Sequence, residues 1–225
     1  LSQTLKSFEL DFLSKNHHVL SIAPSDVQYF KAQKLKNVSY IPVSMTTSPI
    51  KETKAKSICF LGAYNWLPNK EGILWFNTEV LPSLLKQTPE LTLHVAGSFS
   101  EQIEVLKKTE AIEMHGFVPS SKDFISNHGL FVAPILSGSG VKMKVLEAMS
   151  LGVPCILSAH AADGLALPEI IPICQNNKDF ITQVSLLLQN DVLAKQIGRA
   201  GQEYIKQNYA SELVSRKIID ALSIG

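Results

Sequence analysis

Short, continuous hydrophobic runs alternate along this chain with stretches in which hydrophobic residues recur every three or four positions. The first pattern predicts strands buried on both faces, and the second predicts amphipathic helices. The predicted strands are Val19–Ala23, Val38–Ile41, Ser57–Leu61, Leu91–Ala96, Ile112–His115, Leu130–Ala133, Cys155–Leu157 and Ile170–Cys174. The predicted helices cover residues 2–15, 25–35, 70–87, 100–109, 120–127, 141–151, 176–189, 191–207 and 210–223.

The alternation itself predicts the fold class. Strands that are separated by helices pair in parallel, because the chain must cross over before it can add the next strand. We therefore expect an α/β fold with a doubly wound, Rossmann-like parallel sheet and helices on both faces.

One segment interrupts this rhythm. Residues 42–56 carry threonines, prolines and lysines without hydrophobic periodicity, and we expect a linker within them at 46–56. Residues 57–206 then form a complete doubly wound domain. Residues 1–45 hold too few elements for a core of their own, so we expect them to belong to a larger domain whose start is missing.

Composition fits a globular enzyme and excludes other classes. Hydrophobic residues make up 45% and charged residues 18% of the 225 residues, which argues against disorder. A net charge of +1 gives no case for a nucleic-acid partner. No hydrophobic run is as long as a membrane span, and the three cysteines lack metal-ligand spacing. We expect buried, reduced thiols and a cytoplasmic protein.

The start of the predicted helix at 141–151 suggests phosphate binding. A turn with Gly138, Ser139 and Gly140 precedes it, and Lys142 and Lys144 occupy its first turn, where acidic residues are normally favoured. Free N–H groups, glycines and ammonium groups together suit a phosphate or diphosphate. The alternative is a flexible loop before a surface helix on which Lys144 and Glu147 form an exposed pair.

Small and polar residues also follow the other strands. Gly62 and the loop with Asn69 and Lys70 come after the first strand of the domain, and Gly97 comes after the second. The third strand runs into Gly116–Pro119. Because ligands of open α/β sheets bind beyond the carboxyl ends of the strands, these loops predict one shared crevice.

These motifs, in this order and spacing, resemble the C-terminal half of nucleotide-sugar glycosyltransferases of the GT-B type, in the group of retaining enzymes classed as family four. The resemblance covers nearly the whole chain. It rests on Phe60–Gly62 with Trp66–Asn69, Val95–Gly97, Glu113–Pro119, Ala133–Gly140, Lys144–Pro154 and Asp163–Leu165.

The resemblance implies domains and partners. It makes residues 1–45 the tail of a truncated, acceptor-binding N-terminal domain, and residues 207–225 a C-terminal helix that packs back toward that domain. It implies a hexosyltransferase-like enzyme of glycan biosynthesis that is inactive without its missing part. The donor is a nucleotide sugar, and the acceptor is a sugar, a lipid-linked glycan or a protein, with room for peripheral membrane contact through the missing domain.

The resemblance also assigns roles to individual residues. Glu147 corresponds to the glutamate that binds the ribose hydroxyls, and Lys142 to the basic residue on the diphosphate, so these two are the expected catalytic residues. Phe117 and Val118 correspond to the segment beside the base. The other expected donor contacts are Gly62, Asn69, Lys70, Gly138, Ser139, Gly140 and Lys144.

Two departures from the family pattern leave alternatives open. Ser139 stands where many relatives carry a first glutamate, and Ala63 where many carry an arginine. A nucleotide-sugar epimerase of the GT-B type and a non-catalytic nucleotide-sugar-binding module are therefore the alternatives. No Asp-any-Asp motif is present, so we expect neither a metal nor a cofactor. His94 and His115 are expected to be structural, since no zinc-type spacing is found.

Overall fold

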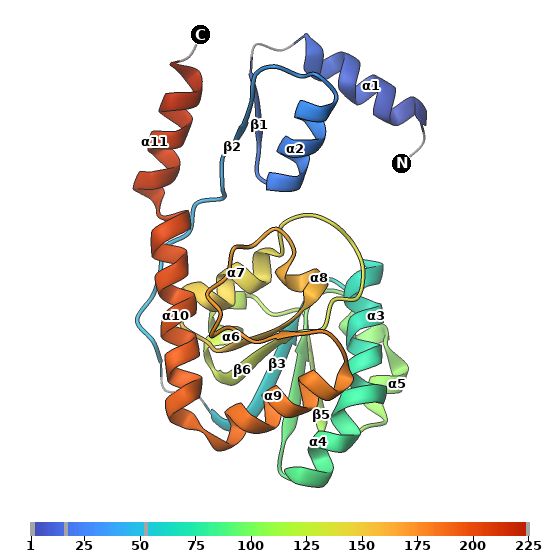
Figure 1. The fold of residues 1–225 in the computed structure, drawn as a ribbon. Coiled ribbons are helices and arrows are strands. Elements are labelled where there is room, and N and C mark those ends of the chain that lie inside the picture. The colour runs from blue at the N-terminus through green and yellow to red at the C-terminus, as the bar shows by residue number, and fades with distance from the viewer. Residues whose placement is uncertain (1–2, 16–17, 52–53, 224–225) are drawn as a thin grey trace. The chain divides into compact units, whose positions relative to one another are not determined.

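The computed structural model describes residues 3–15, 18–51 and 54–223, and the chain divides into two compact units (Figure 1). One unit comprises Leu1–Thr46 together with Gln207–Gly225, and the other comprises Thr47–Lys206. Parts of the predicted N-terminal segment, linker and C-terminal helix, at 1–2, 16–17, 52–53 and 224–225, lie outside the described residues.

Within its described residues, the unit Thr47–Lys206 is built on a six-stranded sheet in which every pair of neighbours is parallel. The strand order is β5-β4-β3-β6-β7-β8, the order of a doubly wound Rossmann-like sheet. The fold predicted from the alternating pattern is thereby confirmed. The strands are β3 (Lys54–Leu61), β4 (Thr92–Ala96), β5 (Ile112–Gly116), β6 (His128–Ala133), β7 (Cys155–Ser158) and β8 (Ile173–Cys174).

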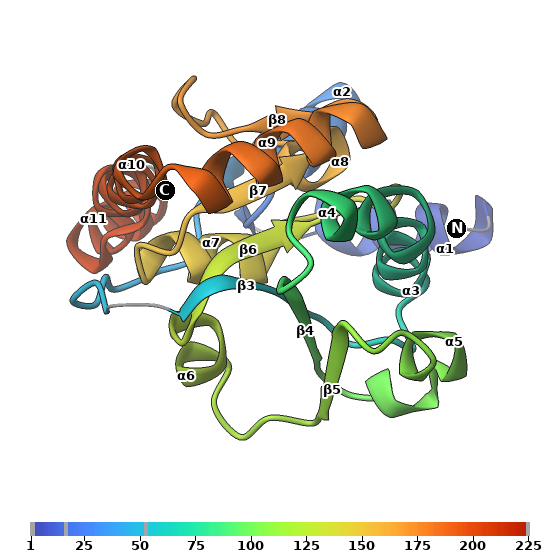
Figure 2. The same ribbon diagram turned by 90° about the horizontal axis from the view of Figure 1, so that it is seen from below.

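Helices cover both faces of this sheet. On one face α4 packs against α9, and on the other α6 packs against α7, β3 and β6 (Figure 2). The helices of this unit are α3 (Leu67–Trp75), α4 (Leu81–Gln87), α5 (Glu104–Lys107), α6 (Ser121–Ser126), α7 (Met143–Ser150), α8 (Ala159–Ala162), α9 (Asn177–Gln189) and most of α10 (Asp191–Tyr209), whose last three residues belong to the other unit. A 3₁₀ turn, η2 (Ser100–Gln102), takes the first part of the helix predicted at 100–109.

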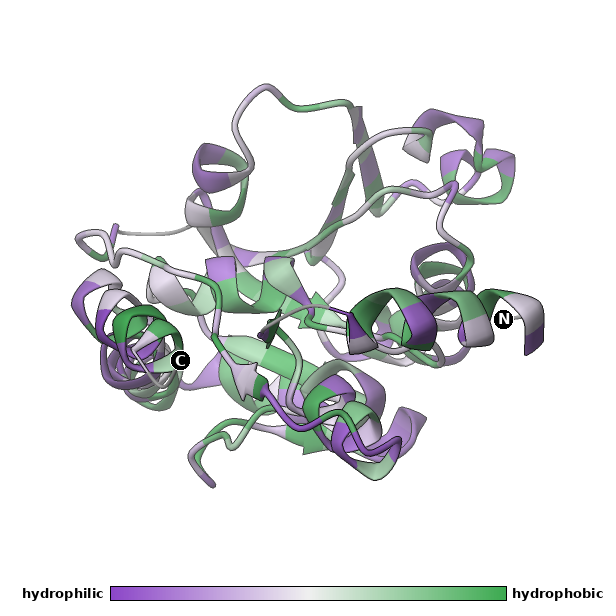
Figure 3. Ribbon diagram, turned by 90° about the horizontal axis from the view of Figure 1, so that it is seen from above, coloured by the Kyte–Doolittle hydropathy of each residue, from purple (hydrophilic) through white to green (hydrophobic). Residues whose placement is uncertain are grey.

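The central strands are mostly hydrophobic because both of their faces are covered. All four residues of β7 are buried, as are Leu130–Ala133 of β6, and the strands near the centre of the view are mostly green in Figure 3. The three cysteines are free and buried, as predicted, and burial raises the pKa of the Cys174 thiol to about 12. No helix within the described part of the chain has the length and apolar character needed to cross a bilayer.

The helix predicted at 70–87 is interrupted by a π-helical turn. Residues Phe76–Val80 form this turn, η1, between α3 and α4. Pro82 explains the interruption, because it has no N–H to donate back to the preceding turn. The Thr78 hydroxyl also donates to the carbonyls of Leu74 and Trp75, at 3.2 Å each, which competes with regular helix hydrogen bonding.

The other unit contains a parallel pair of strands, β1 (Val19–Ser21) and β2 (Val38–Tyr40). Its helices are α1 (Gln3–Ser14), α2 (Pro24–Ala32) and α11 (Ser211–Leu222). Ile41 packs with Val214 and Ala221 in a small buried cluster, which joins the two chain segments of this unit.

Part of the segment predicted as a linker belongs to the unit Thr47–Lys206. The Ser48 N–H donates to the Ser150 carbonyl at 3.1 Å, and Gln202 Nε2 donates to the Ser48 carbonyl at 2.7 Å. β3 begins at Lys54, before the predicted strand start at Ser57. The compact unit thus starts earlier than residue 57, because backbone hydrogen bonds hold a segment that has no hydrophobic periodicity.

Candidate functional site

A pocket of about 510 Å³ opens at the carboxyl ends of β3, β4, β5 and β6. The chain runs from β3 to β4 and β5 on one side and returns to β6 on the other, so the pocket lies at the topological switch point of the sheet. Open α/β sheets bind ligands at this point. The pocket walls come from the loops after these strands and from residues 141–145 at the start of α7.

Glycines let the backbone come close together at the pocket wall. A Cβ atom on Gly97 would lie 2.0 Å from the Gly62 carbonyl oxygen, and one on Gly72 would lie 2.2 Å from the Pro134 carbonyl oxygen. Gly97 also has φ +121°, a conformation that other residues rarely adopt. Main-chain contacts therefore fix the distance between the ends of β3 and β4, and the distance between α3 and the end of β6.

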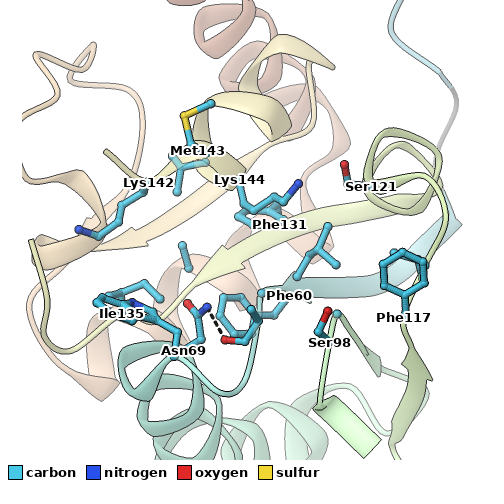
Figure 4. Close-up of a pocket in the computed structure, with 18 of the residues that line it drawn as sticks. Phe60, Asn69, Ser98, Phe117, Ser121, Phe131, Ile135, Lys142, Met143 and Lys144 are labelled. Atoms are coloured by element: carbon cyan, nitrogen blue, oxygen red, sulfur yellow. Dashed lines mark hydrogen bonds between the residues drawn. The ribbon is translucent and has the colours of Figure 1, made fainter. Parts of the chain in front are cut away.

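Lys142 lies at one side of the pocket, as the N-cap residue of α7 (Figure 4). Its Nζ donates to the Gly140 carbonyl at 2.8 Å and to the Gly138 carbonyl at 3.4 Å. Desolvation lowers the pKa of this ammonium group, partly offset by the charge of Asp163. A partly desolvated cation beside the uncapped N–H groups of a helix start is a favourable place for an anion.

Glu147 lies on α7, one turn after Lys144. Its Oε1 accepts a hydrogen bond from the Ser121 hydroxyl, and its Oε2 accepts one from Lys144 Nζ at 2.7 Å. The Glu147 side chain is only 22% exposed, so the carboxylate is held in a fixed position. Ser121 and Lys144 both line the pocket, and Glu147 contacts them without lining the pocket itself.

The side of the pocket opposite Lys142 is more apolar. Phe117 lies there, and Lys144 extends between Lys142 and Phe117 in the close-up view (Figure 4). The Phe117 ring is 75% exposed, and Val118 beside it also lines the pocket. An exposed ring at a pocket rim offers a stacking surface for a planar group.

Most of the residues predicted from sequence line this pocket, but some do not. Gly62, Asn69, Phe117, Val118, Lys142 and Lys144 are in its wall. Lys70 is exposed on α3 and does not line the pocket, because it follows Asn69 around the helix and points elsewhere. Gly138, Ser139 and Gly140 are exposed in the loop beside the pocket and outside its wall. Glu147 reaches the pocket only through its two partners.

Sequence reasoning did not indicate Ser121 as a residue of this site. Ser121 follows Ser120, whose side chain caps α6 by accepting the Asp123 N–H at 3.1 Å. The Ser-any-any-Asp spacing marks the start of α6, which lies within the helix predicted at 120–127. It could not have shown that Ser121 meets Glu147, because that contact depends on the packing of α6 against α7.

The sequence matches the family model of the group 1 glycosyl transferases over residues 55–190. The chain belongs to this family. The match covers more than half of the chain and includes all four strands that end at the pocket. The predicted resemblance to a family-four-like glycosyltransferase with the GT-B fold is thereby confirmed.

A relative of this chain is an uncharacterized 44.6 kDa protein from the cps region of Klebsiella pneumoniae. The two are 26% identical over 173 residues, which is 72% of this chain and 45% of the relative. The chain thus spans about half the length of the curated relative that it matches.

Solved structures share the fold. S. aureus TarM, in a complex with fondaparinux, α-GlcNAc-glycerol and UDP, aligns with a TM-score of 0.78 and 17% identity over 97% of this chain and 46% of its own. HepE from Anabaena, in complex with UDP and glucose, aligns with a TM-score of 0.77 and 14% identity over 100% of this chain and 68% of its own. Sucrose-phosphate synthase from Thermosynechococcus elongatus aligns with a TM-score of 0.76 and 15% identity over 99% of this chain and 61% of its own.

Proposed function

We propose that this chain holds the nucleotide-diphosphate-sugar donor of a retaining, metal-independent glycosyltransferase. The observation that carries the proposal is the pocket at the switch point of the sheet, with a lysine and a helix start at one side and an exposed phenylalanine at the other. We place the diphosphate at Lys142 and the start of α7, and the base beside Phe117 and Val118.

The charges of the site favour Lys142 as the main diphosphate contact. Lys144 is already paired with the Glu147 carboxylate at 2.7 Å, so these two charges largely cancel. Lys142 contacts loop carbonyls, which a more strongly accepting phosphate oxygen can replace. During transfer, the bond from the anomeric carbon to the diphosphate breaks, and the leaving diphosphate keeps the electron pair. Lys142 stabilises this growing negative charge while the acceptor oxygen bonds to the sugar and passes its proton to an oxygen of the departing diphosphate.

Glu147 is suited to bind the ribose. A carboxylate can accept about four hydrogen bonds, and Ser121 and Lys144 use only part of this capacity. Two vicinal ribose hydroxyls can donate to the remaining positions or replace Ser121. The TarM and HepE complexes both contain UDP, which supports UDP as the first probe.

The full-length protein tests the reaction. We expect transfer of the sugar from a UDP-sugar, or slow hydrolysis of it, with a product anomer that matches the donor by NMR. Inversion of a sugar stereocentre without transfer would instead identify an epimerase. Binding without either reaction would identify the non-catalytic module that Ser139 and Ala63 leave open.

Nucleoside diphosphate binding is expected to persist in excess EDTA. The helix N–H groups and Lys142 supply the positive charge in the proposal, so a bridging cation is not needed. Calorimetric titration of UDP, with ADP and GDP in parallel, checks this with and without the chelator. Loss of all binding on chelation would contradict the proposed metal independence, whereas binding of none of the three would contradict the site itself.

Lys142→Ala is expected to weaken UDP binding about tenfold or more, the equivalent of losing a hydrogen bond to a charged group. Binding should also become less sensitive to salt, because screening acts on charge pairs. Lys70→Ala is the matched control, since Lys70 is a neighbouring lysine that does not line the pocket. Equal affinities of both variants across a salt series would show that Lys142 does not contact the diphosphate.

A further inference from the structure

Three histidines from three strands of the sheet lie close together. His94 lies on β4, His115 on β5, and His128 is the first residue of β6. One ring nitrogen from each lies within 4.8 Å of the others. His94 Nδ1 and His115 Nε2 are 3.0 Å apart, so two imidazoles direct nitrogens at the same point.

A carboxylate lies beside two of these histidines, His94 and His115. Glu113 lies on β5, two residues before His115. Its Oε2 is 3.3 Å from His94 Nδ1, and its Oε1 is 3.4 Å from His115 Nε2. Three imidazoles thus lie together, with a carboxylate beside two of them, and these nitrogen and oxygen groups are of the kind that bind zinc and similar divalent ions.

The hydrogen bond of His128 prepares it to act as a ligand. Its Nδ1 lies 2.7 Å from the Phe124 carbonyl oxygen, which can only accept, so this nitrogen carries the proton. The lone pair is then on Nε2. Metal-binding histidines commonly donate their second ring nitrogen to a carbonyl or carboxylate in this way, which fixes the tautomer and the ring orientation.

Burial and access also agree with an ion site. His94 and His128 are 6% and 5% exposed, so two ligands are held rigidly in the core. The side chains of His115 and Glu113 are 27% and 59% exposed, which leaves a path from solvent to the centre of the cluster.

We propose that His94, His115, His128 and Glu113 bind one divalent transition-metal ion of the zinc class. A tetrahedral zinc ion with bonds of 2.0–2.1 Å separates its ligand atoms by roughly 3.4 Å. The distances of 3.0, 3.3 and 3.4 Å in the cluster are close to this value. The ligand nitrogens of all three histidines lie within 4.8 Å of one another, so the ligands must close in on the ion by side-chain rotation when it binds.

This ion is separate from the proposed chemistry at the donor pocket. None of the four ligands lines the pocket within the part of the chain that the structure describes. The metal would join β4, β5 and β6 and would therefore stabilise the fold. The proposal departs from the expectation of no metal, and it stands whether or not the chain binds a nucleotide sugar.

The test uses the chain freed of metal by EDTA and desalting. Calorimetric titration with Zn²⁺ should show one equivalent bound, and titration with Co²⁺ should give the intense visible absorption of a tetrahedral complex. Zn²⁺ should also raise the melting temperature, because an ion that binds only the folded state stabilises it. The variants are His115→Gln and Glu113→Gln, which alter the two exposed ligands and leave the buried ones in place.

We expect His115→Gln to weaken Zn²⁺ binding by more than about tenfold, because loss of even a residue that only hydrogen-bonds to a metal ligand typically lowers metal affinity by about tenfold or more. We expect Glu113→Gln to weaken Zn²⁺ binding less. His160→Gln is the control, since His160 is an exposed histidine on α8 outside the cluster. Absence of stoichiometric binding to the unaltered chain would overturn the proposal. So would unchanged binding by both ligand variants, each checked for folding by circular dichroism, or an equal loss in His160→Gln. UDP binding should survive the EDTA treatment, so the failure of either proposal is read separately.

Discussion

Gly97→Ala should lower the free energy of unfolding by about 3 kcal/mol or more, among the larger effects of single substitutions. The added Cβ would lie 2.0 Å from the Gly62 carbonyl oxygen, and this neighbour is backbone that cannot rotate away. The φ of +121° adds conformational strain. Urea unfolding followed by circular dichroism measures the change.

Gly164→Ala separates the two causes. Gly164 also has a positive φ, of +77°, but an added Cβ there would meet no atom within 4 Å. We expect it to cost about 1 kcal/mol, from the backbone conformation alone. Equal losses for the two variants would mean that the contact between Gly97 and Gly62 contributes little to stability.

Glu147→Ala should weaken UDP binding by about 1 to 3 kcal/mol, or roughly five- to 150-fold, because the proposed ribose hydrogen bonds to a charged group are lost. The loss should be smaller with 2′-deoxy-UDP, which lacks one of the two hydroxyls. Calorimetry with both ligands measures this difference.

Comparing UDP with 2′-deoxy-UDP distinguishes loss of the ribose contact from a general change in the pocket. Removal of Glu147 also leaves Lys144 and Ser121 without their present partner, which alters the pocket for any ligand. Glu79→Ala, at an exposed glutamate on η1, controls for the change in net charge. A loss that is the same for UDP and 2′-deoxy-UDP would contradict the ribose contact.

Features that depend on local pattern could be predicted from the sequence. The strands of the sheet were found because residues buried on both faces are hydrophobic without interruption, as in β7. Lys142 was found from the glycine turn and the helix start that follows it. Asn69 was found because it lies in a loop after a strand end, and strand ends meet at one edge of a parallel sheet. The same reasoning placed Lys70 in the site, but its neighbour Asn69 occupies the wall instead, since adjacent residues of a helix point in different directions.

Features that depend on strand order were beyond the sequence. His94 and His115 meet because β4 and β5 are neighbours, and His128 joins them from β6 on the far side of β3. Nothing in the spacing of these histidines indicates that order. The contact of Ser121 with Glu147 likewise needs the packing of α6 against α7. The π-helical turn did have a signal in Pro82, but tertiary packing decides whether a proline ends a helix or distorts it.

The glycine contacts at the pocket wall also have a consequence for divergence within the family. Because Gly97 and Gly72 place main chain against main chain, the frame of the pocket cannot be widened or narrowed by exchanging one side chain for another. The exposed side chains at the rim, such as Trp66, Phe117 and Met143, are under no such constraint, being 58%, 75% and 42% exposed. A new ligand preference can therefore evolve by exchange at the rim while the frame is inherited unchanged.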